Sequence, residues 1–190
     1  MPEAKRWAGR TVACIASGPS LHPADCDLIR LSGMPTIAVN NSWEMAPFAS
    51  VIYAADPGWW DAYGAEIDID AERWCCMENV AKERGLNWFP VRGPHNSGMI
   101  AIQLAIEFGA ARVILLGYDC SVERGEHWHG PHDKVVNGSP IKNPDAGRCI
   151  MWARQFAMMD RRGADIVNCS RETALTSFRR ERLGDLLCAP

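Results

Sequence analysis

Short apolar runs recur along this chain, each bounded by polar or glycine-containing turns. The runs are partly β-branched and hardly alternate between apolar and polar positions. Near-continuous hydrophobicity is typical of strands that are covered by helices on both faces. We therefore predict strands at residues 10–17, 35–41, 49–56, 72–77, 111–119 and 164–170.

Two segments between these strands have the spacing of amphipathic helices. Residues 97–109, SGMIAIQLAIEFG, begin at a serine, end at a glycine and carry a broad apolar stripe. Residues 143–163 place Pro144 in the first turn and Gly163 at the stop. Strands that alternate with helices predict an α/β fold, here a Rossmann-like three-layer sandwich with a mostly parallel sheet.

Length and composition fit one globular domain spanning residues 1–190, with a long functional loop at about residues 119–143. The net charge of -3 gives no overall positive field, so nucleic acid is not the default partner. No apolar run is long enough for a membrane span and the first residues lack a signal-peptide pattern, so we expect a cytoplasmic protein. The scattered cysteines favour small buried hydrophobes over disulfides.

Two further groups of side chains have more than one interpretation. The arginines near the end favour a solvated helix face over a basic patch: Arg171, Arg179, Arg180 and Arg182. Met151, Met158 and Met159 favour a core face or a dimer face, which leaves a homo-oligomer possible. The tryptophans either stack on a base or sugar or pack in the core: Trp59, Trp60, Trp128 and Trp152.

Small and amide residues follow the predicted strands. In parallel sheets, ligands bind beyond the carboxyl ends of the strands, where backbone amides approach phosphate and side-chain amides recognise a sugar or base. The predicted binding residues are Ser17, Gly18, Pro19, Ser20, Asn40, Asn41, Asp56, Asn96, Ser97 and Gly98. They predict a nucleotide or nucleotide-sugar donor as partner, although any one of these turns alone is also compatible with an ordinary turn or helix cap.

The stretch GEHWHGPHDK contains His127, His129 and His132, three of the chain's five histidines. A histidine with a pKa near 6.5 can act as a general base at neutral pH. Alternatively, His127 and His129 project to one face of an extended segment, and His132 or Asp133 completes an open metal site. In a third interpretation the histidines belong to a polar loop and contribute only hydrogen bonds. The length of the loop favours a function.

The motifs ASGPSL after the first strand, an asparagine after the second, and NSGMIAIQLAIEFGAARVILLGYDCS resemble those of a known superfamily. One branch holds bacterial sialyltransferases that use CMP-activated sialic acid. The other holds motility-accessory and 6-hydroxymethylpterin-diphosphokinase-like domains of uncertain function. The likeness covers roughly residues 10–178 in motif order and is most specific in the NSG-to-GYD block.

The resemblance implies a nucleotide-phosphate site lined by the loop 17–20 and by Ser97 with Gly98. It also implies that Asn40 contacts the nucleotide, and Asp56 falls where the sialyltransferases have an asparagine. His127 with Trp128 matches their histidine-aromatic pair, in which the histidine is the general base. The chain departs from the family at Ser17, in place of an asparagine, and at Asn96, in place of a threonine.

Together these features predict a nucleotide-binding, glycosyltransferase-like enzyme that moves a group from an activated donor to an unidentified acceptor hydroxyl. The predicted catalytic residues are His127, His129 and Asp119, and no cofactor is required. One alternative is diphosphokinase-like phosphoryl transfer with Mg²⁺ held by Asp56 or Asp119. Others are a Zn²⁺ site at the three histidines and a nucleotide-binding module without catalysis.

Overall fold

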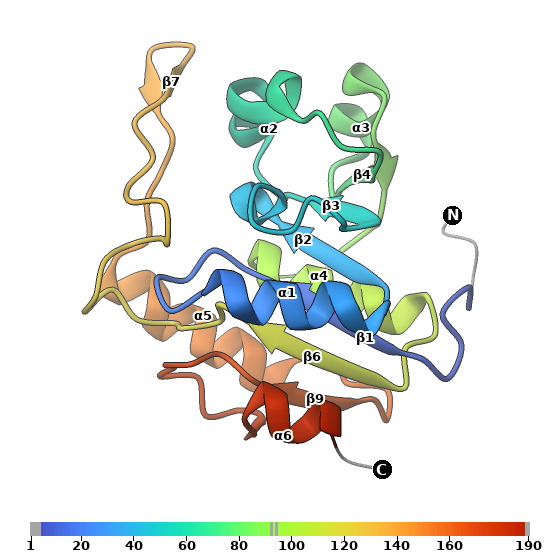
Figure 1. Ribbon diagram of the computed structural model, residues 1–190. Helices are drawn as coiled ribbons and strands as arrows, with labels where there is room; N and C mark the ends of the chain where they lie inside the picture. The colour runs from blue at the N-terminus through green and yellow to red at the C-terminus, as the bar shows by residue number, and fades with distance from the viewer. Residues whose placement is uncertain (1–4, 92, 94, 189–190) are drawn as a thin grey trace.

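The computed structural model describes residues 5–91, 93 and 95–188 and has an eight-stranded parallel sheet at its centre (Figure 1). The strand order is β10-β9-β6-β1-β2-β3-β4-β5. These strands are β1 (Thr11–Ile15), β2 (Thr36–Val39), β3 (Val51–Tyr53), β4 (Glu72–Cys75), β5 (Asn87–Trp88), β6 (Arg112–Leu116), β9 (Asp165–Asn168) and β10 (Arg179–Arg180). An α/β, Rossmann-like three-layer fold is therefore confirmed.

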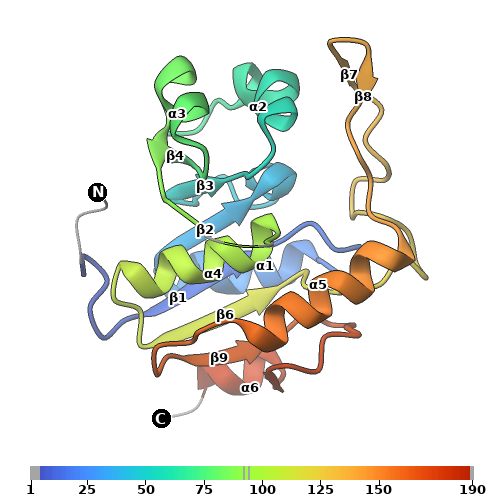
Figure 2. The same ribbon diagram turned by 180° about the vertical axis from the view of Figure 1, so that it is seen from behind.

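Helices cover both faces of the sheet (Figures 1 and 2). One core joins the sheet to α4 (Ser97–Glu107) and α5 (Ala146–Met158). The other core joins it to the remaining four α-helices, α1 (Pro23–Ser32), α2 (Pro57–Tyr63), α3 (Glu78–Arg84) and α6 (Leu183–Cys188). In β1, Val12 and Cys14 enter the first core while Ala13 and Ile15 enter the second. Burial on both sides explains the unbroken apolar runs.

All the predicted strands are present, each shorter than its apolar run. The sequence pattern missed β5 and β10, which have two residues each and lie at the sheet edges. The expectation of a helix face at Arg179 and Arg180 is wrong, because these residues form β10 and pair with Val167 and Asn168. Such short, exposed strands carry no readable periodicity.

The two predicted helices are α4 and α5, although α5 is shorter than expected. Asp145 caps α5 through a hydrogen bond from the Arg148 amide, so Pro144 precedes the helix. The helix ends at Met158, before Gly163. The pattern missed the other helices; α1, for example, gives a weak signal because it buries only Cys26 and Ile29.

The long segment after β6 leaves the sheet and returns to α5. It carries a small antiparallel hairpin of β7 (Val135–Val136) and β8 (Ser139–Pro140), which extends away from the sheet near α2 (Figures 1 and 2). Two short 3-10 helices, η1 (Asn40–Trp43) and η2 (Gly64–Glu66), complete the described elements. None of the helices in the described ranges has the length and apolar character needed to cross a membrane.

Candidate functional site

A cavity of about 150 Å³ opens at the carboxyl ends of β1 and β6. The chain leaves β1 toward α1 on one face of the sheet and leaves β6 toward α5 on the opposite face. The two neighbouring strands therefore form a topological switch point, where ligands of open α/β sheets bind. The lining residues are Ala16, Ser17, Gly18, Val39, Asn40, Asn96, Ser97, Gly98, Gly117, Tyr118, Asp119, Cys120, Ser121, Glu126, His127, Pro144, Cys149, Trp152 and Phe156.

The turn after β1 is held against the end of β6 by Asp119. The buried Asp119 carboxylate accepts hydrogen bonds from the Ser20 amide at 2.8 Å and the Ser20 hydroxyl at 2.7 Å. A side chain on Gly18 would overlap this carboxylate, since an added Cβ would lie 2.6 Å from Asp119 Cγ. Burial raises the pKa of Asp119, against the opposing effect of the Ser20 hydrogen bonds. Asp119 thus fixes the turn and gives the cavity an ionisable wall.

The N-terminus of α4 forms a second wall. Asn96 caps the helix by accepting a hydrogen bond from the Met99 amide at 2.8 Å, and its amide group donates to Gln155 of α5 at 2.9 Å. The Ser97 hydroxyl accepts a hydrogen bond from the Ala55 amide at 3.1 Å. Gly98 packs against Tyr118, because an added Cβ would lie 2.9 Å from the Tyr118 ring. These contacts fix the helix end that faces the cavity.

The neighbouring asparagines after β2 have different environments. Asn40 lines the cavity, has a left-handed backbone with φ of 51°, and buries its side-chain oxygen without a partner among the described residues. Asn41 points into the core, where its oxygen accepts a hydrogen bond from Trp59 Nε1 at 2.6 Å and its amide group donates to Glu44 at 3.0 Å. Only Asn40 is placed to meet a ligand in the cavity.

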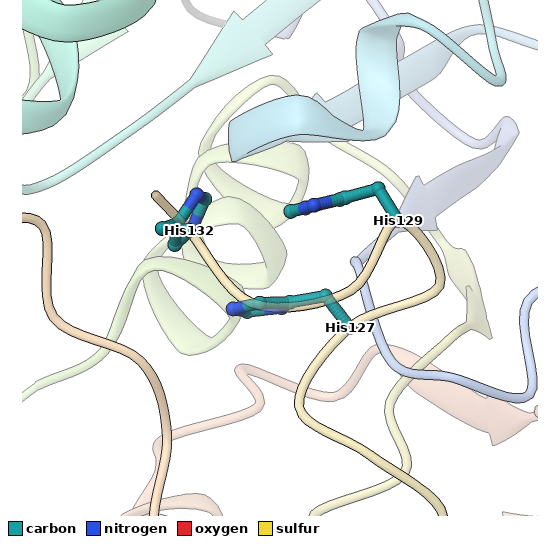
Figure 3. A group of neighbouring side chains, drawn as sticks. All are labelled: His127, His129 and His132. Carbon is teal, nitrogen blue, oxygen red and sulfur yellow. The ribbon is translucent and has the colours of Figure 1, made fainter. Parts of the chain in front are cut away.

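The three histidines of the loop form a cluster beside the cavity (Figure 3). The rings gather around a common space, and each offers one nitrogen within 4.8 Å of the other two. The rings of His127 and His129 are stacked with centroids 4.9 Å apart, and His132 lies 4.7 Å and 5.1 Å from them. His127 also lines the cavity, which links the cluster to it.

Hydroxyl groups orient two of these rings. Ser17 Oγ lies 2.9 Å from His127 Nδ1, and Tyr63 Oη lies 2.8 Å from His132 Nδ1. The Nε2 atoms of His127 and His129 are buried and have no hydrogen-bond partner within the described chain. Burial, together with the neighbouring imidazoles, lowers the pKa of His127 to about 3 and that of His132 to about 4, so both rings are neutral at neutral pH. His127 is therefore a weaker base than a histidine with the pKa near 6.5 that was expected from the sequence.

Backbone and side-chain hydrogen bonds secure the loop at both ends of the cluster. The Trp128 amide donates to the Ser17 carbonyl at 3.0 Å. The Asn143 side chain accepts from the His132 amide at 2.6 Å and donates to the His132 carbonyl at 3.2 Å. Lys134 donates to the Ala62 carbonyl on α2 at 3.0 Å and pairs with Glu66. The cluster is therefore tied to the turn after β1, to α2 and to its own loop.

The predicted site residues separate into two groups. Those that line the cavity are Ser17, Gly18, Asn40, Asn96, Ser97, Gly98, Asp119 and His127. Those that lie outside it are Pro19, Ser20, Asn41, Asp56, His129 and His132. Asp56 caps α2 by accepting a hydrogen bond from the Gly58 amide at 2.8 Å, and Pro19 lines an adjacent hollow.

Sequence reasoning missed the contribution of α5 to the cavity, made by Cys149 and Phe156, and named Trp152 only as one tryptophan of several. The apolar positions of α5 were visible in the sequence. Their spacing did not show a role in the cavity, because a helix face that packs in the core and one that binds a ligand have the same periodicity. Trp59 and Trp60 are buried core residues and do not face the cavity.

No protein-family model, curated protein or solved structure matches the chain.

Proposed function

We propose that this protein is a nucleotide-binding, glycosyltransferase-like transferase, which moves a group from a nucleotide-activated donor to an acceptor hydroxyl. The observation that carries the proposal is the cavity at the switch point between β1 and β6, bordered by the N-terminus of α4. Nucleotides bind at this position in open α/β sheets because backbone amides and a helix N-terminus favour phosphate there.

Each wall of the cavity suits one part of such a donor. The first amides of a helix lack intrahelical acceptors, and Asn96 takes up those of Met99 and Ile100. The amides of Ser97 and Gly98 therefore remain to bind phosphate. Asn40 offers the nucleoside an oxygen that has no partner among the described residues, and Trp152 on α5 gives an apolar surface for a base or sugar.

The reaction requires one bond exchange and one proton transfer. The acceptor oxygen forms a bond to the transferred carbon while the bond from that carbon to the donor phosphate breaks. The electron pair leaves with the phosphate, whose charge the N-terminal end of α4 stabilises. His127, which borders the cavity and is neutral, accepts a hydrogen bond from the acceptor hydroxyl, and the proton passes to solvent.

The magnesium-dependent alternative would use carboxylates that already have partners. Asp119 accepts two hydrogen bonds from Ser20, and Asp56 caps α2. We therefore expect Asp119→Asn to keep metal-independent nucleotide binding, because an asparagine oxygen still accepts from the Ser20 amide. Loss of all nucleotide binding in this variant, together with a strict need for Mg²⁺ in the wild type, would favour phosphoryl transfer instead.

A thermal-shift panel tests the proposal. The protein is freed of metal with EDTA and melted with CMP, CDP, UDP, GDP or ADP. A nucleotide present at a hundred times its Kd stabilises the native state by about 2.7 kcal/mol, which corresponds to a rise in Tm of roughly 5–10 °C for a chain of this size. We expect one base to give this rise in EDTA. No rise with any of the five nucleotides would refute the proposal.

Donor turnover then separates an enzyme from a binding module. The nucleotide selected by the panel is supplied as its sugar conjugate, and release of the free nucleotide is followed over hours. Release that is lost in His127→Ala supports a transferase with water as a slow substitute acceptor. Intact donor, with binding retained in His127→Ala, would identify a nucleotide-binding module.

A further inference from the structure

We infer that His127, His129 and His132 form a binding site for a divalent transition-metal ion, zinc in the first place. Three imidazoles from one loop each offer a nitrogen within 4.8 Å of the others. Imidazole is a preferred ligand of zinc, and three protein ligands with one open position are typical of catalytic zinc sites. A tetrahedral ion with Zn–N bonds of about 2.0–2.1 Å needs nitrogens about 3.4 Å apart, so zinc binding would draw the three rings closer together than the 4.8 Å within which their nitrogens lie.

Two ring nitrogens without hydrogen-bond partners among the described residues support a metal ion separately from the spacing of the rings. A buried polar atom without a partner costs about 1–3 kcal/mol, yet His127 Nε2 and His129 Nε2 are both buried without one among the described residues. A polar loop whose histidines served only as hydrogen-bond donors would not bury two unpartnered nitrogens in one cluster. An ion between the rings gives both of them a partner.

The surrounding hydrogen bonds select the nitrogen that each ring presents. With Nδ1–H of His127 donating to Ser17 Oγ and Nδ1–H of His132 donating to Tyr63 Oη, the lone pairs of both Nε2 atoms face away from these hydroxyls. Partners of this kind orient metal-binding histidines in known sites and fix their tautomer. Glu44, Asp56 and Asp133 lie close enough to place negative charge around the cluster, which also favours a cation.

The open position gives the ion a role in the proposed transfer, and this step alone rests on the proposed function. An acceptor hydroxyl bound at the open position loses its proton to solvent more readily, because the cation stabilises the alkoxide. The alkoxide oxygen then attacks the donor carbon, and the nucleotide phosphate leaves with the electron pair of the broken bond. His127 would hold the ion rather than act as a free base.

Zinc binding is measured first, without nucleotide. The EDTA-treated full-length protein is titrated with Zn²⁺ in a calorimeter, and His129→Gln is compared with His22→Ala, which removes a histidine that caps α1 far from the cluster in sequence. We expect one zinc per chain in the wild type and in His22→Ala, and at least a hundredfold weaker binding in His129→Gln. Equal binding by both variants, or less than one ion per chain in the wild type, would overturn the site.

A second variant keeps the test decisive if His129→Gln does not fold. Tyr63→Phe leaves all three ligands in place and removes only the hydroxyl next to His132 Nδ1. Loss of such an outer partner typically weakens metal binding ten- to a hundredfold, and we expect a decrease in this range. Unchanged affinity would show that the Tyr63 hydroxyl does not orient a metal ligand, which contradicts the geometry inferred here.

The open position is tested with the cobalt-substituted protein. Azide added to Co²⁺-loaded protein changes the visible absorption bands if it can occupy a free coordination position. A change supports the catalytic arrangement, whereas none would overturn the role of the ion in proton removal. Because nucleotide binding is measured in EDTA and metal binding without nucleotide, failure of this inference and failure of the proposed function are separate results.

Discussion

Asn40 and Asn41 are adjacent in sequence, yet the structure predicts opposite consequences when each is replaced. Asn41→Ala removes the acceptor of the Trp59 indole, and Trp59 is only 1% exposed, so its N–H has no access to water. An orphaned buried donor costs about 1–3 kcal/mol. At about 2 kcal/mol, Tm falls by roughly 4–8 °C for a chain of this length.

Asn40→Gly makes the complementary change. The Asn40 side-chain oxygen has no partner within the described chain, and its φ of 51° suits glycine, so the free energy of unfolding should stay within about 1 kcal/mol of the wild type. One lost hydrogen bond to a bound nucleotide costs about 0.5–1.5 kcal/mol, or roughly a two- to tenfold weaker Kd.

The assay combines urea denaturation of both variants with calorimetric titration of the nucleotide selected by the thermal-shift panel. We expect Asn41→Ala to be destabilised with unchanged nucleotide affinity below its melting range, and Asn40→Gly to be stable with weaker affinity. The reverse pattern, in which Asn41→Ala loses affinity and Asn40→Gly loses stability, would refute the assignment of these residues to core and cavity.

Further predictions concern a glycine and a surface carboxylate. Gly98→Ala places a methyl group 2.9 Å from the Tyr118 ring and should cost about 1–3 kcal/mol and weaken nucleotide binding, whereas Gly184→Ala, in open space on α6, should be neutral or stabilising in the same urea melts. Equal stability of the two variants would contradict the close packing of α4 on Tyr118. Hydrogen bonds from Arg179, and to a lesser degree from Arg112, lower the pKa of Asp165 to about 2 against the effect of partial burial. Since the folded-state pKa lies below the unfolded one, this carboxylate stabilises the fold above about pH 4 and the contribution disappears as the pH falls toward 2. The wild type should therefore lose stability relative to Asp165→Asn between pH 4 and pH 2, and parallel pH profiles of Tm would exclude this contribution.

The sequence predicted the centre of the fold well because burial on both faces leaves a strong local signal. The strands β1 and β6 could be predicted from their local sequence alone, because helices cover both of their faces and the buried residues form unbroken apolar runs. Elements at the periphery have no such signal. The two-residue strand β10 is held by pairing with β9 and by ion pairs, which the local pattern does not contain.

The candidate site was predictable by position along the chain but not by the direction of each side chain. Strand ends in a parallel sheet meet at one edge, so Ser17, Asn40 and Asp119 were expected near one another, and they line one cavity. Whether Asn40 or Asn41 faced that cavity depended on the turn of η1 and on the indole of Trp59. The convergence of the three histidines depended on Ser17 and Tyr63, which are distant in sequence.

A crystal structure of the protein grown with the nucleotide that the thermal-shift panel selects would show directly whether the cavity between β1 and β6 binds it. We expect the phosphate to lie against the amides of Ser97 and Gly98 and the nucleoside to lie beside Asn40, between the turns that follow β1 and β6. A nucleotide bound at any other surface, with this cavity filled only by solvent, would contradict this expectation.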